Sequence, residues 1–91
     1  MNQQRWEVWY GGHVQGVGFR YTTCAVARGF EVTGYVQNLP DGRVHLVAEG
    51  EPTEVTAFLD KLEARMEPFI REIRKDRTVA TGEFNAFEVR Y

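Results

Sequence analysis

Two hydrophobic periods alternate along this chain of 91 residues, and their order limits the folds that are open to it. Alternation of apolar and polar residues is typical of a half-buried strand, and a spacing of three and four residues is typical of an amphipathic helix. The strand-like segments are residues 5–10, 32–38, 44–49 and 87–91, and the helix-like segments are residues 19–30 and 52–66. A further strand-like segment, residues 70–79, is dense in charge, which favours the edge of a sheet.

This order of segments predicts the split βαβ, or ferredoxin-like, α+β arrangement: an antiparallel sheet of four or five strands with both helices on one face. The sequence Leu39-Pro40-Asp41-Gly42 is typical of a tight turn and predicts a hairpin between two of the strands. The length allows one domain, residues 1–91. Because many functions use this fold, the function must be argued from a site.

Composition excludes several classes of partner. The net charge is −2, which favours neither nucleic acid nor an anionic membrane. The lone cysteine, Cys24, excludes an internal disulfide and a thiolate metal cluster. The N-terminal residues are polar, and no apolar run is long enough to cross a membrane. We therefore expect a cytoplasmic monomer with no nucleic-acid or membrane partner.

Residues 11–20, GGHVQGVGFR, are rich in glycine and end in an arginine between a strand and a helix. Glycine lets the backbone approach a ligand closely, and amides that open into a helix N-terminus point at one place. Arg20 adds a charge and a planar set of donors matched to phosphate or carboxylate. The segment predicts an anion cradle, although such a loop alone can equally be a turn, and it lacks the Gly-Lys-Ser/Thr of a P-loop.

Residues 12–20, GHVQGVGFR, and residues 34–44, GYVQNLPDGRV, resemble the two signature segments of the acylphosphatase family. Weaker similarity continues to residues 87–89, so that the resemblance covers nearly the whole chain. It implies a small ferredoxin-like α/β fold and hydrolysis of acyl phosphates to a carboxylate and inorganic phosphate. It also implies that Arg20 binds the phosphate and that Asn38 orients the attacking water.

The chemistry of the residues agrees with that resemblance. An acyl phosphate has a good leaving group, so an enzyme must mainly hold the phosphoryl group, neutralise its oxygens and place a water in line. Arg20 and the amides of the loop fit the first two tasks. The loop residues assigned to the phosphate are Gln15, Gly16, Val17, Gly18 and Phe19. The carboxamide of Asn38 can accept from a water and donate to substrate at once.

Asn38 does not ionise, so we expect a phosphate oxygen of the substrate to take the proton from the water. Neither signature segment contains paired carboxylates or a well-placed histidine that could act as a base. Two separated histidines without a carboxylate cluster also predict no metal site, and no cofactor is expected. If the strand that ends at Asn38 lies beside the glycine-rich loop, Asn38 and Arg20 converge.

Simpler interpretations apply to individual residues. Asn38 in isolation would be a residue that caps a turn. Cys24 lies in Cys-x3-Arg, not in the Cys-x5-Arg spacing of thiolate phosphatases, so we assign it to packing. His13 borders the loop and either adds a pH-dependent charge or is a solvated polar residue. His45 is expected on the outward face of its strand, unrelated to catalysis.

Two other classes of function remain open at the level of sequence. A non-catalytic phosphate-binding or regulatory domain could share this fold, and turnover of a simple acyl phosphate discriminates against it. An RNA-recognition module also has this element order, but it carries aromatic residues on its third strand. The corresponding residues 43–49 contain no aromatic residue, which disfavours RNA binding.

Overall fold

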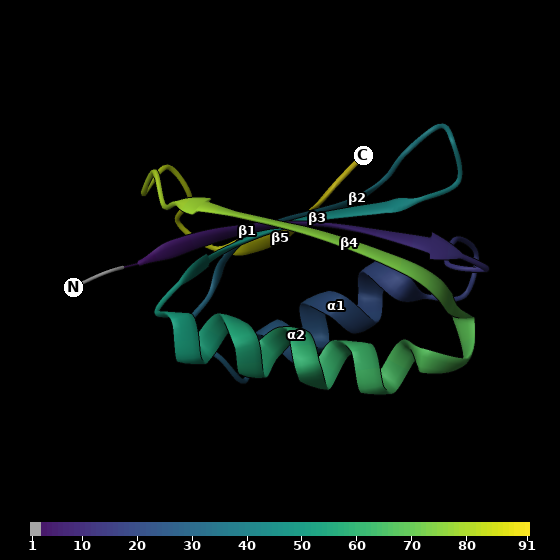
Figure 1. Ribbon diagram of the computed structural model, residues 1–91, viewed down its shortest axis with the longest axis horizontal. Coiled ribbons are helices and arrows are strands. Elements are labelled where there is room, and N and C mark those ends of the chain that lie inside the picture. The colour runs from purple at the N-terminus through teal and green to yellow at the C-terminus, as the bar shows by residue number, and fades with distance from the viewer. Residues whose placement is uncertain (1–2) are drawn as a thin grey trace.

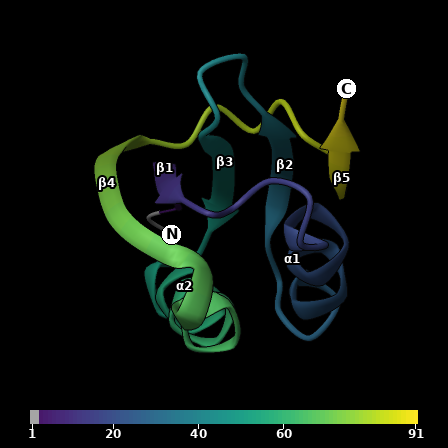
Figure 2. The ribbon, with the colours of Figure 1, turned by 90° about the vertical axis from the view of Figure 1, so that its right-hand side faces the viewer.

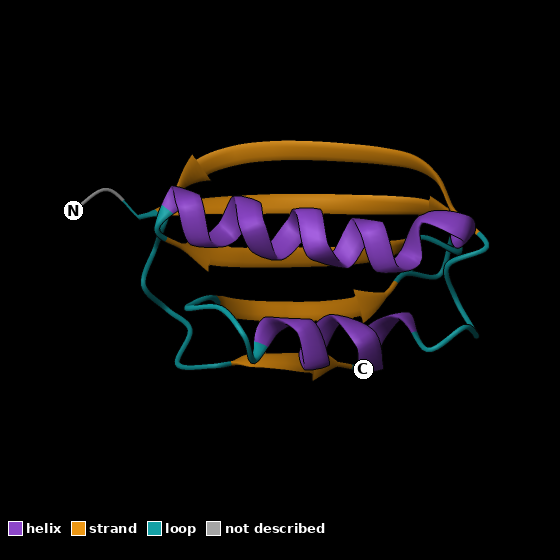
Figure 3. Ribbon diagram, turned by 90° about the horizontal axis from the view of Figure 1, so that it is seen from below, coloured by secondary structure: helices purple, strands orange, loops and turns teal. Residues whose placement is uncertain are grey.

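The computed structural model describes residues 3–91 and has a sheet with two helices beneath it (Figure 1). The elements are β1 (Gln4–Gly12), α1 (Phe19–Ala27), β2 (Thr33–Asn38), β3 (Val44–Gly50), α2 (Pro52–Met66), the 3-10 turn η1 (Glu67–Phe69), β4 (Ile70–Val79) and β5 (Phe87–Arg90). The strands lie in the order β4-β1-β3-β2-β5, and both helices cover one face (Figure 3). The predicted ferredoxin-like class is confirmed.

The sheet is mixed, not purely antiparallel, because β5 pairs with β2 in the parallel sense. β4 and β5 occupy opposite edges, so residues 80–86 must cross the whole sheet between them. β4 is antiparallel to β1, and β2 has the same direction as β1 because each is antiparallel to β3. After β4 the chain reverses direction, so β5 runs in the same direction as β2.

Helix α1 is shorter than its sequence pattern predicts. It ends at Ala27, and the amide of Gly29 donates to the carbonyl of Val26 (3.0 Å) as the chain turns away. Phe30, which was expected to end the helix, instead packs its ring against Phe58 of α2 (centroids 6.3 Å apart). A glycine just after the last helical turn is a common helix stop, so the helix ends before Phe30.

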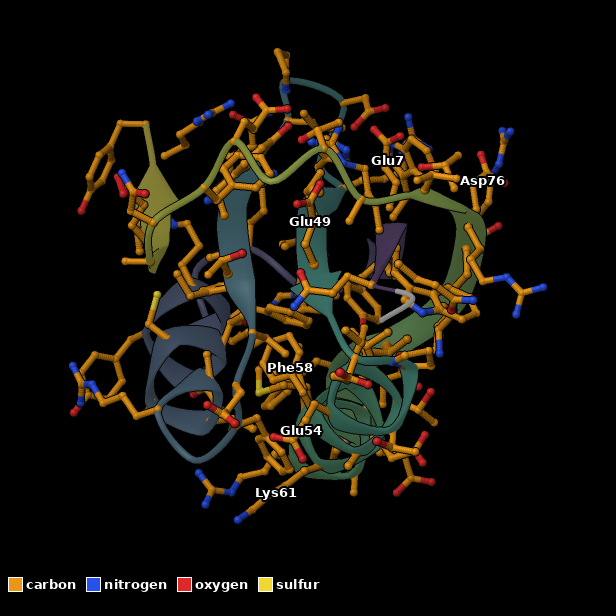
Figure 4. All side chains as sticks on the ribbon, turned by 90° about the vertical axis from the view of Figure 1, so that its left-hand side faces the viewer. Glu7, Glu49, Glu54, Phe58, Lys61 and Asp76 are labelled. Carbon is orange, nitrogen blue, oxygen red and sulfur yellow. The ribbon has the colours of Figure 1, made fainter. Side chains whose placement is uncertain are left out.

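The core lies between the inner face of the sheet and the two helices. Val8 and Tyr10 of β1 and Leu46 of β3 are fully buried there, together with Phe58 and Leu62 of α2. Figure 4 shows Phe58 between the layers. The Tyr10 hydroxyl donates to a carboxylate oxygen of Glu63 (2.8 Å), which offsets the cost of burying a phenol. This packing holds α1 firmly against the strands that carry the predicted site.

The outer face of the sheet contains buried polar side chains. Every residue of β3 is buried. Val44, Leu46 and Ala48 belong to the core beneath the sheet, whereas on the outer face His45 lies against Trp9 and Glu49 lies against residues 81–82. Glu49 is only 2% exposed and accepts hydrogen bonds from Arg5 Nε (2.7 Å) and from the amides of Thr81 (2.9 Å) and Gly82 (3.0 Å). Figure 4 shows Glu49 on the side of the sheet away from the helices. The carboxylate therefore anchors the connection that leads to β5.

The remaining predictions about elements agree with the structure. β4 lies at an edge of the sheet and is exposed along its length after Ile70, as its charge density predicted. The turn that closes the β2–β3 hairpin has the amide of Leu39 donating to the carbonyl of Arg43 (2.8 Å). Neither helix within residues 3–91 is long and apolar enough to span a membrane.

Candidate active site

The connection between β1 and α1 folds into a left-handed turn that leads directly into the helix. Gly16 has φ +80° and Gly18, the N-cap of α1, has φ +77°. A Cβ at either position would meet no atom within 4 Å, so glycine is needed there for its backbone conformation and not for space. Figure 2 looks onto the end of the molecule where this connection crosses to α1.

The start of α1 offers its amides to a ligand. The first bond of the helix runs from the amide of Thr22 to the carbonyl of Gly18 (2.9 Å), so the amides before Thr22 have no helical acceptor. Within residues 3–91, the amides of residues 15–19 donate to no backbone carbonyl. Because these groups carry the positive end of the helix dipole, they favour an anion.

The side chains of the loop anchor it to the rest of the fold. Gln15 Nε2 donates to the carbonyls of Leu39 (2.9 Å) and Arg43 (3.0 Å), and thereby ties the loop to the turn after β2. The Phe19 ring is buried and packs against Tyr10 (centroids 5.1 Å apart). Val17 packs on the edge of the core. These contacts leave only backbone groups of residues 15–19 to face a ligand.

Asn38 ends β2, next to this loop. Its side-chain oxygen Oδ1 is buried and has no hydrogen-bond partner within the described residues 3–91. Buried carbonyl oxygens without a donor are rare in folded proteins, and each one calls for an explanation. The oxygen is therefore not committed to another group of the described residues.

A pocket of about 300 Å³ brings these groups together. Its walls come from the glycine-rich loop, the first turn of α1, the end of β2 and the end of the chain after β5. The lining residues are Val14, Gly16, Gly18, Phe19, Arg20, Tyr21, Asn38, Val89 and Tyr91. The predicted residues Arg20 and Asn38 thus share one cavity, whereas Gln15 and Val17 do not line it.

Four lining residues, Val14, Tyr21, Val89 and Tyr91, were not among the site residues predicted from the sequence. Val89 and Tyr91 reach it only because β5 lies beside β2, which depends on the crossover of residues 80–86. Tyr21 follows Arg20 directly in the first turn of α1, and this adjacency was the one signal in the sequence that could have indicated it.

Arg20 is the charged group of the pocket. Its guanidinium lies over the ring of Tyr91, 5.2 Å from the centroid. Within residues 3–91, no carboxylate lies within ion-pair distance of Arg20, and its side chain donates no hydrogen bond that would commit it elsewhere. The charge is therefore free to meet an anion, while the aromatic ring limits where the guanidinium can move.

The other candidates lie outside this pocket. Burial raises the pKa of the Cys24 thiol, and the side chain lines a separate hollow beside Phe30 and Phe87, which agrees with a packing role. His45 faces outward as predicted, but it is buried under Trp9 and lies 2.6 Å from Glu7. His13 contacts neither Arg20 nor Asn38 and does not line the pocket.

Within residues 3–91, no group of three or more histidine, cysteine or acidic side chains is arranged to hold a metal ion. A larger and more open hollow of about 690 Å³ lies at the far end of β4, lined by residues such as Arg77 and Gly82. It contains none of the glycine-rich segment, whereas the smaller pocket is lined by both Arg20 and Asn38.

The structure is a ferredoxin-like α+β domain with a pocket that combines residues of the glycine-rich loop, one arginine and one asparagine. The sequence profile of the acylphosphatase family matches residues 6–89 of this chain. The chain therefore belongs to the acylphosphatase family, a family of hydrolases, and hydrolysis of acyl phosphates is the activity that family and fold support.

Individual relatives agree with this membership. An acylphosphatase of Thermobifida fusca is 41% identical, over 99% of this chain and 100% of its own length. An acylphosphatase of Archaeoglobus fulgidus is 40% identical, over 93% of this chain and 96% of its own length. Among solved structures, the acylphosphatase of Bacillus subtilis superposes with a TM-score of 0.86 at 26% identity, over 97% of this chain and 99% of that one.

Proposed function

We propose that this protein hydrolyses acyl phosphates by direct attack of water on a phosphoryl group held between the glycine-rich loop and Arg20. The observation that carries the proposal is that an unpaired arginine and an asparagine with an unpartnered buried oxygen line the same pocket. The arginine and the loop amides neutralise the phosphoryl oxygens, and this fixed arrangement requires no reorganisation during the reaction.

Asn38 positions the nucleophile. Its Oδ1 accepts a hydrogen bond from the water, while its Nδ2 donates to a phosphoryl oxygen. The oxygen of the water forms a bond to phosphorus as the bond from phosphorus to the acyl oxygen breaks in line. The carboxylate leaves with the electron pair, and a phosphoryl oxygen takes the proton of the water. The products are a carboxylate and inorganic phosphate.

A continuous assay on a synthetic acyl phosphate tests this function directly. We expect turnover by the wild-type protein that a chelator does not reduce, because the proposed mechanism uses no metal ion. Phosphate binding without turnover would instead support the non-catalytic phosphate-binding or regulatory domain. Loss of turnover in chelator would overturn the metal-free mechanism.

We further propose that residues 1–91 act as one domain and as a cytoplasmic monomer without a nucleic-acid partner. The net charge of −2 and the single cysteine, Cys24, support this assignment. Light scattering on the purified protein measures its mass in solution, and a dimer would contradict the proposal. Filter binding to RNA that weakens steeply with salt would revive the RNA-recognition alternative.

A further inference from the structure

Exposed aromatic side chains gather at the mouth of the anion pocket. Within residues 3–91, the large apolar side chains that are exposed are Tyr21, Ile73, Val79 and Tyr91. Tyr21, which is 75% exposed, and Tyr91, which is fully exposed, both line the pocket that contains Arg20. The other two belong to the edge strand β4 and lie outside it. Exposed rings at a concave polar site indicate contact with a ligand.

The two tyrosines approach Arg20 from separate elements. Tyr21 is the neighbour of Arg20 in the first turn of α1, and Tyr91 follows β5 and places its ring against the guanidinium. Val89 of β5 adds a half-buried apolar side chain to the same wall. The pocket is therefore divided: the loop amides, Arg20 and Asn38 form a polar part, and the side chains from β5 with Tyr21 form an apolar part.

The volume of the pocket leaves room for more than a phosphoryl group. The pocket has a volume of about 300 Å³, and a water molecule occupies only about 30 Å³ in the liquid. The space beyond the phosphoryl group borders the apolar wall, and the group that is covalently attached to the phosphoryl group of an acyl phosphate is the acyl group.

We propose that Tyr21 and Tyr91 bind the acyl group of the substrate, so that the protein favours acyl phosphates with an aromatic or other bulky apolar acyl group over acetyl phosphate. This inference rests on the proposed function. A bulky apolar acyl group covers the two rings and removes their apolar surface from water, and an aromatic one also packs against them. The single methyl group of acetyl phosphate covers little of either ring.

The test compares benzoyl phosphate with acetyl phosphate, which share the phosphate end and differ in the acyl group. Their intrinsic reactivities differ too, so the informative quantity is the change, between variants, in the ratio of their kcat/KM values. We expect Tyr21→Ala and Tyr91→Ala each to lower the benzoyl-to-acetyl ratio about fivefold, the scale of one lost aromatic contact. Tyr21→Phe and Tyr91→Phe should keep the ratio, because they keep the ring.

Val79→Ala is the matched control, since Val79 is 81% exposed but lies on β4 away from the pocket. It should leave the ratio unchanged. Tyr91→Ala also removes the ring that contacts Arg20, so competitive inhibition by inorganic phosphate is measured alongside it. Weaker binding of the phosphoryl group lowers kcat/KM for both substrates by the same factor and leaves the benzoyl-to-acetyl ratio unchanged.

The possible outcomes separate this inference from the function on which it rests. If both substrates are hydrolysed and neither alanine variant changes the ratio, the acyl-binding role is overturned and the proposed function stands. If the wild-type protein hydrolyses neither substrate, the proposed function is overturned. In that case calorimetry with benzoylphosphonate and acetylphosphonate, which lack the bond that is broken, tests the acyl-binding role. Equal affinities for the two compounds would overturn that role.

Discussion

At the scale of single residues, the proposed mechanism separates the binding of phosphate from the placement of water. It assigns the phosphoryl oxygens to the charge of Arg20 and to the amides of the loop. Asn38 has no charge, but it has a buried oxygen that no group within residues 3–91 satisfies. Substitutions at these two positions should therefore change different kinetic constants.

Arg20→Ala removes the cation of the pocket and should lower kcat/KM about a hundredfold or more, the range seen when one charge-stabilising donor is removed. Inhibition by inorganic phosphate should weaken in parallel, because ground-state binding uses the same contact. Arg28→Ala is the control: Arg28 is an exposed arginine at the end of the same helix and does not line the pocket. Unchanged inhibition by phosphate in the Arg20 variant would contradict the assignment.

Asn38→Ala should lower kcat about a hundredfold while inhibition by phosphate changes little, because the variant loses the water contact and keeps Arg20. Steady-state kinetics with phosphate as inhibitor measure both quantities. Asn85→Ala, at an exposed position in the connection to β5, should behave like the wild-type protein. Full kcat in the Asn38 variant would rule out its role in orienting water.

At the scale of elements, the site depends on how the β1–α1 loop enters its helix. Two contacts fix the loop. The Gln15 side chain donates hydrogen bonds to the turn after β2, and the Phe19 ring is buried in the core. Its amides can converge only with positive φ at Gly16 and Gly18. Any residue with a Cβ is strained there, whatever space surrounds it.

Gly18→Ala should lower the free energy of unfolding by about 1 kcal/mol, the cost of the left-handed conformation for a residue with a Cβ. It should also weaken inhibition by phosphate, because relief of the strain moves the amides of the loop. Gly29→Ala is the control, since Gly29 has no positive φ and its Cβ would make an ordinary contact with the Val26 carbonyl. Urea denaturation and inhibition by phosphate are measured for both variants. Equal free energies of unfolding and equal inhibition would count against the anion cradle.

At the scale of the whole molecule, Glu49 links the core of the sheet to the crossover. Burial alone would raise the pKa of this carboxyl group, but hydrogen bonds from Thr81, Arg5 and Gly82 outweigh burial and hold the pKa below its usual range. The crossover in turn carries β5, and with it the apolar wall of the pocket. The anchor at Glu49 therefore supports the site from the opposite face of the sheet.

Protonation of Glu49 at low pH should remove its contribution to the free energy of unfolding. Because the pKa of Glu49 is lower in the folded state, its contribution is present above the unfolded pKa, about 4.3, and is lost as the pH falls through the folded value. Glu49→Gln should be less stable than the wild-type protein at pH 7, and the difference should shrink below about pH 4. Urea denaturation across this range measures it. A difference that does not depend on pH would contradict the role of the charge.

Much of the fold and half of the site could be predicted from the sequence, because their signals are local. Hydrophobic periods determine which segments become strands and helices, and the glycine pattern with Arg20 indicates an anion cradle. The two signature segments indicated Asn38 and the family, and the profile match confirms the family. These features depend on neighbours within one element or one turn.

The tertiary structure alone decided the rest. The parallel pairing of β5 with β2, the burial of Glu49 and the arrival of Val89 and Tyr91 at the pocket all follow from one crossover of the sheet. His45 is buried instead by side chains of the neighbouring strands, Trp9 and Tyr35. No local pattern encodes the direction of a strand or what covers its outer face, since both depend on contacts between residues far apart in the chain. The sequence by itself indicated the glycine-rich loop, Arg20 and Asn38, and only packing over long range brought Val89 and Tyr91 to the same pocket.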